Sequence, residues 1–257
     1  MPQRRKSAHA PPRSPAAGPA ARASQVYAGL FSDPTVLFTA AVLCTPLLFV
    51  RTFSGALAYL LQPLLLASYV LFAGVLWFTA RGRCVPLSAG DLALARWALC
   101  NGVYYNLFLD VFAGQFQLLG EMTVQYNRVE PRYALGAGHP VGAPVFFTSM
   151  LELLFQAPLG LLTFYLVHRG APGRHTAALV LSVLHAAGVW YFYVPEALNG
   201  FKNLGGWPKT AAEAVSFDRL LFFWFGFWFC GLLWTTVAVV VGARAARAIA
   251  AAVGPAA

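Results

Sequence analysis

The chain has 257 residues, of which 59% are apolar and 11% are charged. Soluble globular domains have roughly 45–50% apolar and about 25% charged residues, so this composition excludes a water-soluble enzyme, a coiled coil and a disordered chain. The formal net charge of +9 would suit a nucleic acid, but the positions of the basic residues argue against such a partner. The aromatic residues, 21 Phe, 10 Tyr and 7 Trp, occur in long apolar runs and indicate a polytopic membrane protein.

Residues 1–34 differ from the rest of the chain. They are rich in Ala, Pro, Ser and Arg, and their only acid is Asp33. Such a segment cannot bury enough apolar surface to fold alone. We therefore predict a disordered basic tail on the cytosolic side, with a targeting extension as the alternative.

Six apolar stretches follow, at about 35–50, 57–79, 97–119, 144–167, 176–194 and 220–241. A helix needs about 20 residues to cross the hydrocarbon core, and continuous runs favour helices over a barrel. We predict an all-α polytopic transmembrane helical bundle with a five-helix domain over 57–243. An extra N-terminal apolar segment and linker occupies 35–56 and is either a span or a re-entrant segment. A C-terminal tail covers 244–257.

The basic residues predict the orientation of this bundle. If all six stretches cross, one side carries only the acids Asp33 and Asp91 against twelve basic residues: Arg4, Arg5, Lys6, Arg13, Arg22, Arg81, Arg83, Arg96, Arg169, Arg174, Arg244 and Arg247. The other side carries five acids and six basic residues: Arg51, Arg128, Arg132, Lys202, Lys209 and Arg219. An excess of Lys and Arg marks the cytosolic face. Both termini are therefore predicted to be cytosolic.

Two acids, Asp110 and Glu152, lie inside predicted spans. A charge at the centre of a membrane helix costs at least ~2.5–3.5 kcal/mol on insertion scales. These side chains therefore form either a structural hydrogen-bonded pair or the polar floor of a ligand cavity, and we favour the cavity. Two carboxyls in a dry site share one proton, so the pair could act as acid and base or clamp an ammonium group.

Helical spacing adds neighbours to each acid. Asn106 and Asp110 are four residues apart and share a helix face, with Tyr105 beside them. A second face collects residues at i, i+3 and i+7: Ser149, Glu152 and Gln156. Pro158 follows in the same helix and can open it locally, because proline cannot donate a backbone hydrogen bond.

Aromatic residues cluster in the last two stretches, among them Trp190, Tyr193 and Trp234. Most are expected to pack or to face lipid, but some could form the walls of a flat apolar ligand site and stabilise a cation. His185 is interpreted as a core histidine rather than a proton carrier. No spacing of Cys and His predicts a metal site.

Several local patterns carry a family resemblance. Tyr126, Glu130, Arg132 and Tyr133 have the spacing of a loop motif Tyr-x3-Asp-x-Arg-Tyr, with Glu replacing Asp. The other patterns are Cys84–Leu87, Arg96–Cys100, Leu107–Asp110, Glu152–Pro158 and Glu196–Phe201. In this order, over about 60–241, the chain resembles the emopamil-binding protein and sigma-two receptor superfamily, the EXPERA membrane domain.

The resemblance also has consequences for the site. Asp110 and Glu152 match the pocket carboxylates of the sigma-two branch. In the isomerase branch, a His and a Glu fall on Asn106 and Asp110, and the third-helix Glu falls on Ser149. An Asn of the last helix falls on Gly231, while Trp234 is kept. The cavity is thus matched, but the proton relay of the isomerase branch is not.

Two functions are implied. The first is a cofactor-free sterol Δ8-to-Δ7 isomerase of the endoplasmic reticulum, with Glu152 as proton donor and Asp110 as base or cation stabiliser. The second is binding of a sterol or a cationic amphiphile without turnover; a purely structural role is the third reading. The expected binding residues are Tyr105, Asn106, Ser149, Gln156, Trp190, Tyr193 and Trp234. The expected partners are this ligand and the lipid bilayer, not a nucleic acid, and a homodimer is left open.

Overall fold

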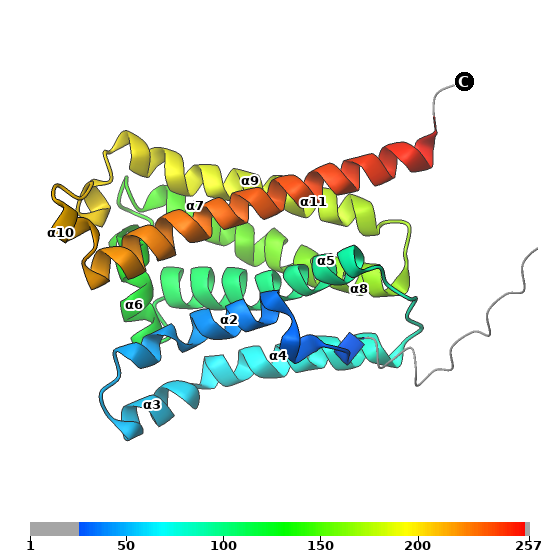
Figure 1. Ribbon diagram of the computed structural model, residues 1–257, viewed down its shortest axis with the longest axis horizontal. Helices are drawn as coiled ribbons and strands as arrows, with labels where there is room; N and C mark the ends of the chain where they lie inside the picture. The colour runs from blue at the N-terminus through cyan, green and yellow to red at the C-terminus, as the bar shows by residue number, and fades with distance from the viewer. Residues whose placement is uncertain (1–25, 255–257) are drawn as a thin grey trace, which may run out of the picture.

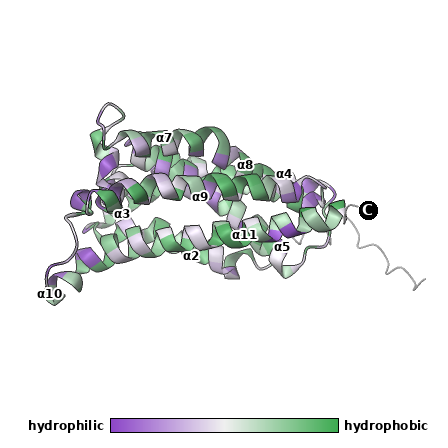
Figure 2. Cartoon of the chain, turned by 90° about the horizontal axis from the view of Figure 1, so that it is seen from above, coloured by the Kyte–Doolittle hydropathy of each residue, from purple (hydrophilic) through white to green (hydrophobic). Residues whose placement is uncertain are grey.

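The computed structural model describes residues 26–254. This part of the chain is built from helices and contains no strand. The long helices lie side by side along one axis (Figure 1), and apolar residues cover much of their length while hydrophilic residues gather toward the two ends (Figure 2). The predicted all-α polytopic bundle is confirmed.

Four helices in the described residues are long and apolar enough to cross a membrane. They are α4 (Pro63–Arg81), the unit of α7, η5 and α8 (Ala143–Arg169), α9 (Arg174–Leu198), and η7 with α11 (Arg219–Val253). The last unit has 35 residues and is therefore roughly 50 Å long, more than the hydrocarbon core of about 30 Å. It continues as helix through most of the predicted C-terminal tail, because that segment is rich in Ala, the strongest helix former.

A fifth long helix lies at the centre of the bundle. It consists of α5 (Ala89–Cys100), which continues directly into η3 (Asn101–Gln115). Nearly all of its residues from 95 to 114 are buried, and α2, α4, α6, α7 and α8 pack around it. Because other helices cover it, this helix can carry more polar side chains than one that faces lipid.

The N-terminal apolar segment forms α2 (Pro34–Cys44) and η2 (Thr45–Leu48), which pack beside α5 and α6. This unit is shorter than the other apolar helices and falls below the ~20 residues of a full span. Then α3 (Phe53–Leu60) leads into α4. The sequence alone left a span and a re-entrant segment open for this region.

Regular structure begins before residue 34, where the predicted N-terminal tail was expected to end. Leu30–Ser32 forms the short helix η1, and Val26 and Leu30 are buried. Asp33 caps α2 by accepting the Thr35 N–H at 2.9 Å, and it forms an ion pair with Arg96 at 2.8 Å. Arg96, which charge counting assigned to a loop, is therefore a buried anchor for this segment. Residues 1–25 of the predicted tail lie outside the described residues.

The connections gather at the two ends of the bundle (Figure 1). One end holds the α4–α5 and α8–α9 loops and the end of α11. The opposite end holds α3, α6 (Glu121–Val129), η4 (Pro131–Leu135), η6 (Lys202–Leu204) and α10 (Ala211–Ala214). These are the two sets of loops that the charge argument separated.

Candidate functional site

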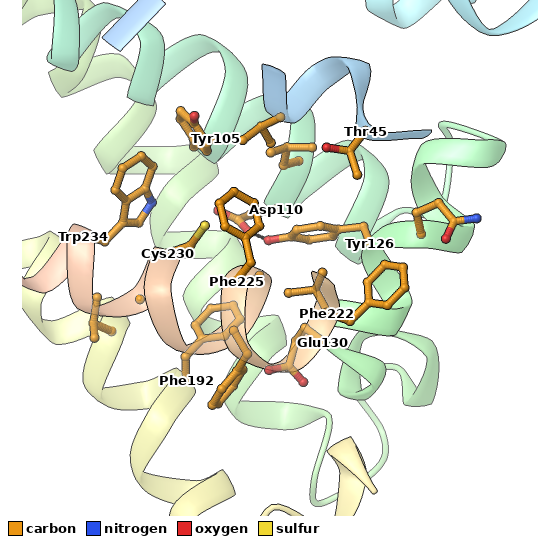
Figure 3. Close-up of a pocket in the computed structure, with 18 of the residues that line it drawn as sticks. Thr45, Tyr105, Asp110, Tyr126, Glu130, Phe192, Phe222, Phe225, Cys230 and Trp234 are labelled. Atoms are coloured by element: carbon orange, nitrogen blue, oxygen red, sulfur yellow. Dashed lines mark hydrogen bonds between the residues drawn. The ribbon is translucent and has the colours of Figure 1, made fainter. Parts of the chain in front are cut away.

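A cavity of about 180 Å³ lies inside the bundle between η2, η3, α6, η5, α9 and the start of the last helix (Figure 3). Its walls are mostly apolar and aromatic. Asp110 and Glu152 both line it, although they are 42 residues apart in the sequence and belong to different helices. The expected convergence of the two acids on one cavity is therefore present.

The helices that line the cavity are locally unwound into π-helical turns. The Phe116 N–H donates to the Val111 carbonyl at 2.8 Å, and the Ala157 and Cys230 N–H groups likewise donate to carbonyls five residues back. Such wide turns are rare and occur frequently at functional sites. One of them, η5 (Glu152–Gln156), ends just before Pro158, which cannot donate a backbone hydrogen bond. The opening of this helix thus coincides with Glu152.

Asp110 accepts hydrogen bonds from two tyrosines, of which Tyr126 lines the cavity. The hydroxyls of Tyr126 and Tyr133 both donate to its Oδ1, the second at 3.2 Å, and Tyr126 points at Asp110 across the cavity (Figure 3). The carboxyl of Glu152 lies near Asp110 in the same cavity, and its Oε2 has no hydrogen-bond partner in the described residues. The two tyrosine donors favour the charged form of Asp110.

The loop motif that supplies these tyrosines is held by a buried ion cluster. Arg132 lies 2.5 Å from Glu130 and 3.6 Å from Glu196, and it donates to the Phe192 carbonyl at 2.7 Å. Burial raises the pKa of Glu130 even though Arg132 opposes the shift. Burial lowers the pKa of Arg132, but the hydrogen bond to Glu130 outweighs it and leaves that pKa above its usual range. The cluster joins the loop to α9 and so fixes both tyrosines.

The family model described as EXPERA (EXPanded EBP superfamily) matches residues 116–245. The chain belongs to this family. The matched range includes the loop motif, Glu152, and the parts of α9 and α11 that line the cavity, while Asp110 lies just before it. Together with the four apolar helices, membership confirms an integral membrane protein. No curated protein matches the chain.

The structure divides the residues that were predicted to bind a ligand. Four of them line the cavity of this EXPERA protein: Tyr105, Gln156, Tyr193 and Trp234. The other three, Asn106, Ser149 and Trp190, are not among the described residues that line the cavity. The Asn106 Oδ1 accepts from Asn101 at 3.2 Å, Ser149 donates to the Val145 carbonyl at 3.0 Å, and Trp190 is 66% exposed.

The three residues leave the cavity wall for different reasons, and the helix period accounts for Asn106. A regular α-helix has 3.6 residues per turn. Asn106 instead pairs with a residue five positions earlier, as a π-helix allows. Ser149 returns its hydroxyl to the carbonyl four residues back, which is common for serine inside a helix. Trp190 belongs to the exposed face of α9.

Two cavity features were not predicted from the sequence. His185 lines the cavity, is 4% exposed, and has no hydrogen-bond partner for its Nδ1 in the described residues. Gly231 also lines it, and a Cβ there would overlap the Tyr193 hydroxyl, which donates to the Phe227 carbonyl. Tyr193 thus fills the space at the position where the isomerase branch carries Asn. The sequence signal for this arrangement of Tyr193 was a glycine within an aromatic-rich helix.

Proposed function

We propose that this EXPERA protein is a cofactor-free sterol Δ8-to-Δ7 isomerase of the endoplasmic reticulum membrane. The supporting observation is the asymmetry of the acid pair: Asp110 accepts two tyrosine hydroxyls, while the Glu152 Oε2 has no hydrogen-bond partner in the described residues. Two carboxyls in different environments can take the roles of acid and base at one site. Glu152 is the proton donor and Asp110 is the base.

The reaction follows from these roles. The O–H of Glu152 gives its proton to one carbon of the ring double bond, and the π electrons form the new C–H bond and leave a cation on the other carbon. Asp110 removes a proton from the neighbouring carbon on the far side of this cation, and the electrons of that C–H bond form the shifted double bond. No atom is gained or lost.

The contact between the two acids also resets the site. After one turnover Asp110 holds the proton and Glu152 is charged. Because both carboxyls line one cavity, a hydrogen bond formed between them returns the proton from Asp110 to Glu152 without its leaving the cavity. Catalysis then needs neither bulk water nor a cofactor.

The walls suit the charged intermediate. Tyr105 and Trp234 pack edge to face with ring centres 4.5 Å apart at the cavity wall, and ring faces stabilise a cation. An apolar enclosure excludes water that would trap the cation. His185, with its free Nδ1 at this wall, is available to hydrogen-bond a polar group of the ligand.

A second candidate is binding of a sterol or a cationic amphiphile without turnover. It is favoured by Asn106, which stands at the histidine position of the isomerase branch and is bonded to Asn101 rather than placed in the cavity. In this case charged Asp110 pairs with an amine and protonated Glu152 holds Asp110 in place.

Expression in a yeast strain without its own Δ8-isomerase separates the two candidates. We expect the chain to restore Δ7 sterols, and Asp110→Asn and Glu152→Gln to abolish them at equal protein level. Asp218→Asn removes an exposed carboxyl that pairs with Arg128 and serves as the matched control. Absence of Δ7 sterols with the unmodified chain, together with saturable binding of a cationic amphiphile, would overturn the isomerase and support the second candidate.

A further inference from the structure

A second hollow lies on the outside of the bundle, between α4 and α8. This groove has a volume of about 470 Å³ and is lined almost entirely by apolar side chains: Val70, Leu71, Gly74, Val75, Phe78, Thr79, Leu161, Leu162 and Tyr165. Val70 and Phe78 are 71% and 62% exposed. It shares no residue with the acid-lined cavity, and its open, apolar surface suits a hydrocarbon chain.

Three arginines stand where the groove meets the basic end of the bundle. Arg81 is the last residue of α4, Arg83 lies two residues beyond it, and Arg169 is the last residue of α8. The Arg169 guanidinium lies against the backbone of Gly82, where a Cβ would collide with it, and its Nη1 is 3.7 Å from the Cys84 Sγ. The absence of a side chain at Gly82 therefore lets the Arg169 guanidinium reach the backbone that connects Arg81 and Arg83.

Aromatic side chains connect the groove to these cations. The Arg169 guanidinium lies 4.6 Å above the ring of Tyr165, which stacks on Phe78 at 5.8 Å. Arg81 covers the ring of Trp77 at 3.6 Å. Aromatic rings of this kind sit at the level of the lipid headgroups in membrane proteins, so the arginines are placed at the depth of the lipid phosphates.

The three arginines have no anionic partner in residues 26–254. Within those residues, the ion pairs involve only Arg96, Arg128, Arg132 and Arg219. Guanidinium groups bind phosphate strongly through paired N–H donors, and basic pockets between membrane helices on the cytosolic side bind anionic lipid headgroups. An external anion would complete the charge balance at this corner.

We propose that the groove and the arginine trio of Arg81, Arg83 and Arg169 form a binding site for one anionic phospholipid. Its phosphate lies among the guanidinium groups and one acyl chain lies along the groove past Gly74. A second copy of the chain is the poorer occupant, because nothing in residues 26–254 shows that it would place an acidic side chain against these three arginines. The site does not depend on the reaction in the central cavity.

The test uses the full chain in nanodiscs that contain phosphatidylserine and phosphatidylcholine, followed by native mass spectrometry of the lipids that stay bound. We expect one phosphatidylserine to be retained in preference to phosphatidylcholine. The double change Arg81→Gln with Arg169→Gln should lower this retention on the order of 30-fold, since each basic residue near a membrane surface contributes about a factor of five. Arg244→Gln with Arg247→Gln, at the same end of the bundle on α11, is the matched control and should change little.

A second variant tests the groove apart from the charge. A Cβ on Gly74 meets no atom within 4 Å, so Gly74→Leu fills the groove without distorting the helix and leaves all three arginines in place. We expect it to lower phosphatidylserine retention by roughly fivefold, in line with the lost burial of about one methylene group. Thermal unfolding of each variant in the same detergent verifies that it is folded.

Three results would overturn the site. Equal losses from the Arg81/Arg169 and Arg244/Arg247 variants would mean that surface charge alone attracts the lipid. Unchanged retention in folded Gly74→Leu would remove the groove from the site, and equal retention of phosphatidylcholine would remove the headgroup contact. Sterol conversion by the Asp110 and Glu152 variants is read separately, so failure of the isomerase proposal would leave this result unaffected.

Discussion

Two groups of buried carboxyls lie close together in this protein and are neutralised in different ways. Glu130 and Glu196 flank the guanidinium of Arg132, and Glu196 also accepts the backbone and side-chain N–H groups of Asn203 at 3.0 and 2.7 Å. Within residues 26–254, Asp110 and Glu152 take part in no ion pair, and Asp110 accepts two tyrosine hydroxyls. On the proposed function, the pair bound to Arg132 anchors the loop, whereas the pair that lines the cavity moves a proton.

This contrast assigns structure to one group and chemistry to the other. The Arg132 cluster joins the loop after α6 to α9 and needs no proton to be stable. The Asp110–Glu152 pair lines the cavity and is organised by two tyrosines that this same cluster holds in place. The predictions below separate these roles.

The largest expected effect is on activity at the acid pair. Asp110→Asn and Glu152→Gln should each lower sterol conversion by about 10²–10⁴-fold, the usual contribution of a general acid or base. Neither should lower the thermal unfolding temperature appreciably, because a neutral amide leaves no buried charge behind. Conversion in isolated membranes and melting in detergent measure the two quantities. A variant that unfolds the protein would place this pair with the structural group.

Arg132→Gln should instead act on stability. It leaves the buried carboxyls of Glu130 and Glu196 without their cation, and breaking such a buried pair costs about 3–5 kcal/mol. Arg128→Gln is the matched control, because its ion pair with Asp218 is exposed and such pairs contribute about 0–1 kcal/mol. Chemical denaturation in detergent compares them. Equal losses in the two variants would contradict the structural role of Arg132.

Tyr126→Phe tests the link between the two groups. It removes one donor from Asp110 while Tyr133 keeps its own, and a hydrogen bond to a charged group contributes about 1.5–3 kcal/mol. We expect roughly a 10- to 100-fold loss of conversion with the protein still folded. Tyr165→Phe, on the outer groove, is the control for loss of a hydroxyl. An active Tyr126→Phe protein would show that Asp110 does not depend on this donor.

The smallest effect concerns an exposed carboxyl. The pKa of Glu213 is lowered by the Lys209 backbone N–H and then by Arg219, which donates at 2.7 Å. The hydrogen bonds of charged Glu213 therefore stabilise this loop at neutral pH. This stabilisation is lost as the pH falls through the lowered pKa of Glu213. Hydrogen exchange of residues 209–214 should quicken at acidic pH relative to Glu213→Gln, which lacks this titration. The same pH dependence in both proteins would exclude Glu213 as its source.

The residues at the site show how far reasoning from the sequence reaches. Asp110 and Glu152 could be found without a structure, because ionisable side chains inside apolar runs are costly and need a partner. Tyr126, Glu130, Arg132 and Tyr133 could be grouped by their spacing. Their separate tasks could not be assigned, because spacing along a loop does not tell which side chain meets an ion and which meets Asp110.

Composition and the placement of charge thus determined the helical membrane bundle, the two ends of its loops, and the pair of acids inside it. Tertiary structure alone decided that Asn106, Ser149 and Trp190 lie away from the cavity wall, that His185 belongs to it, and that Tyr193 occupies the space above Gly231. For Asn106 the reason is a π-helix, which changes which residues share a helix face; for the others, which lie in regular α-helices, it is how each helix face packs in the bundle. A regular period read from the sequence contains neither.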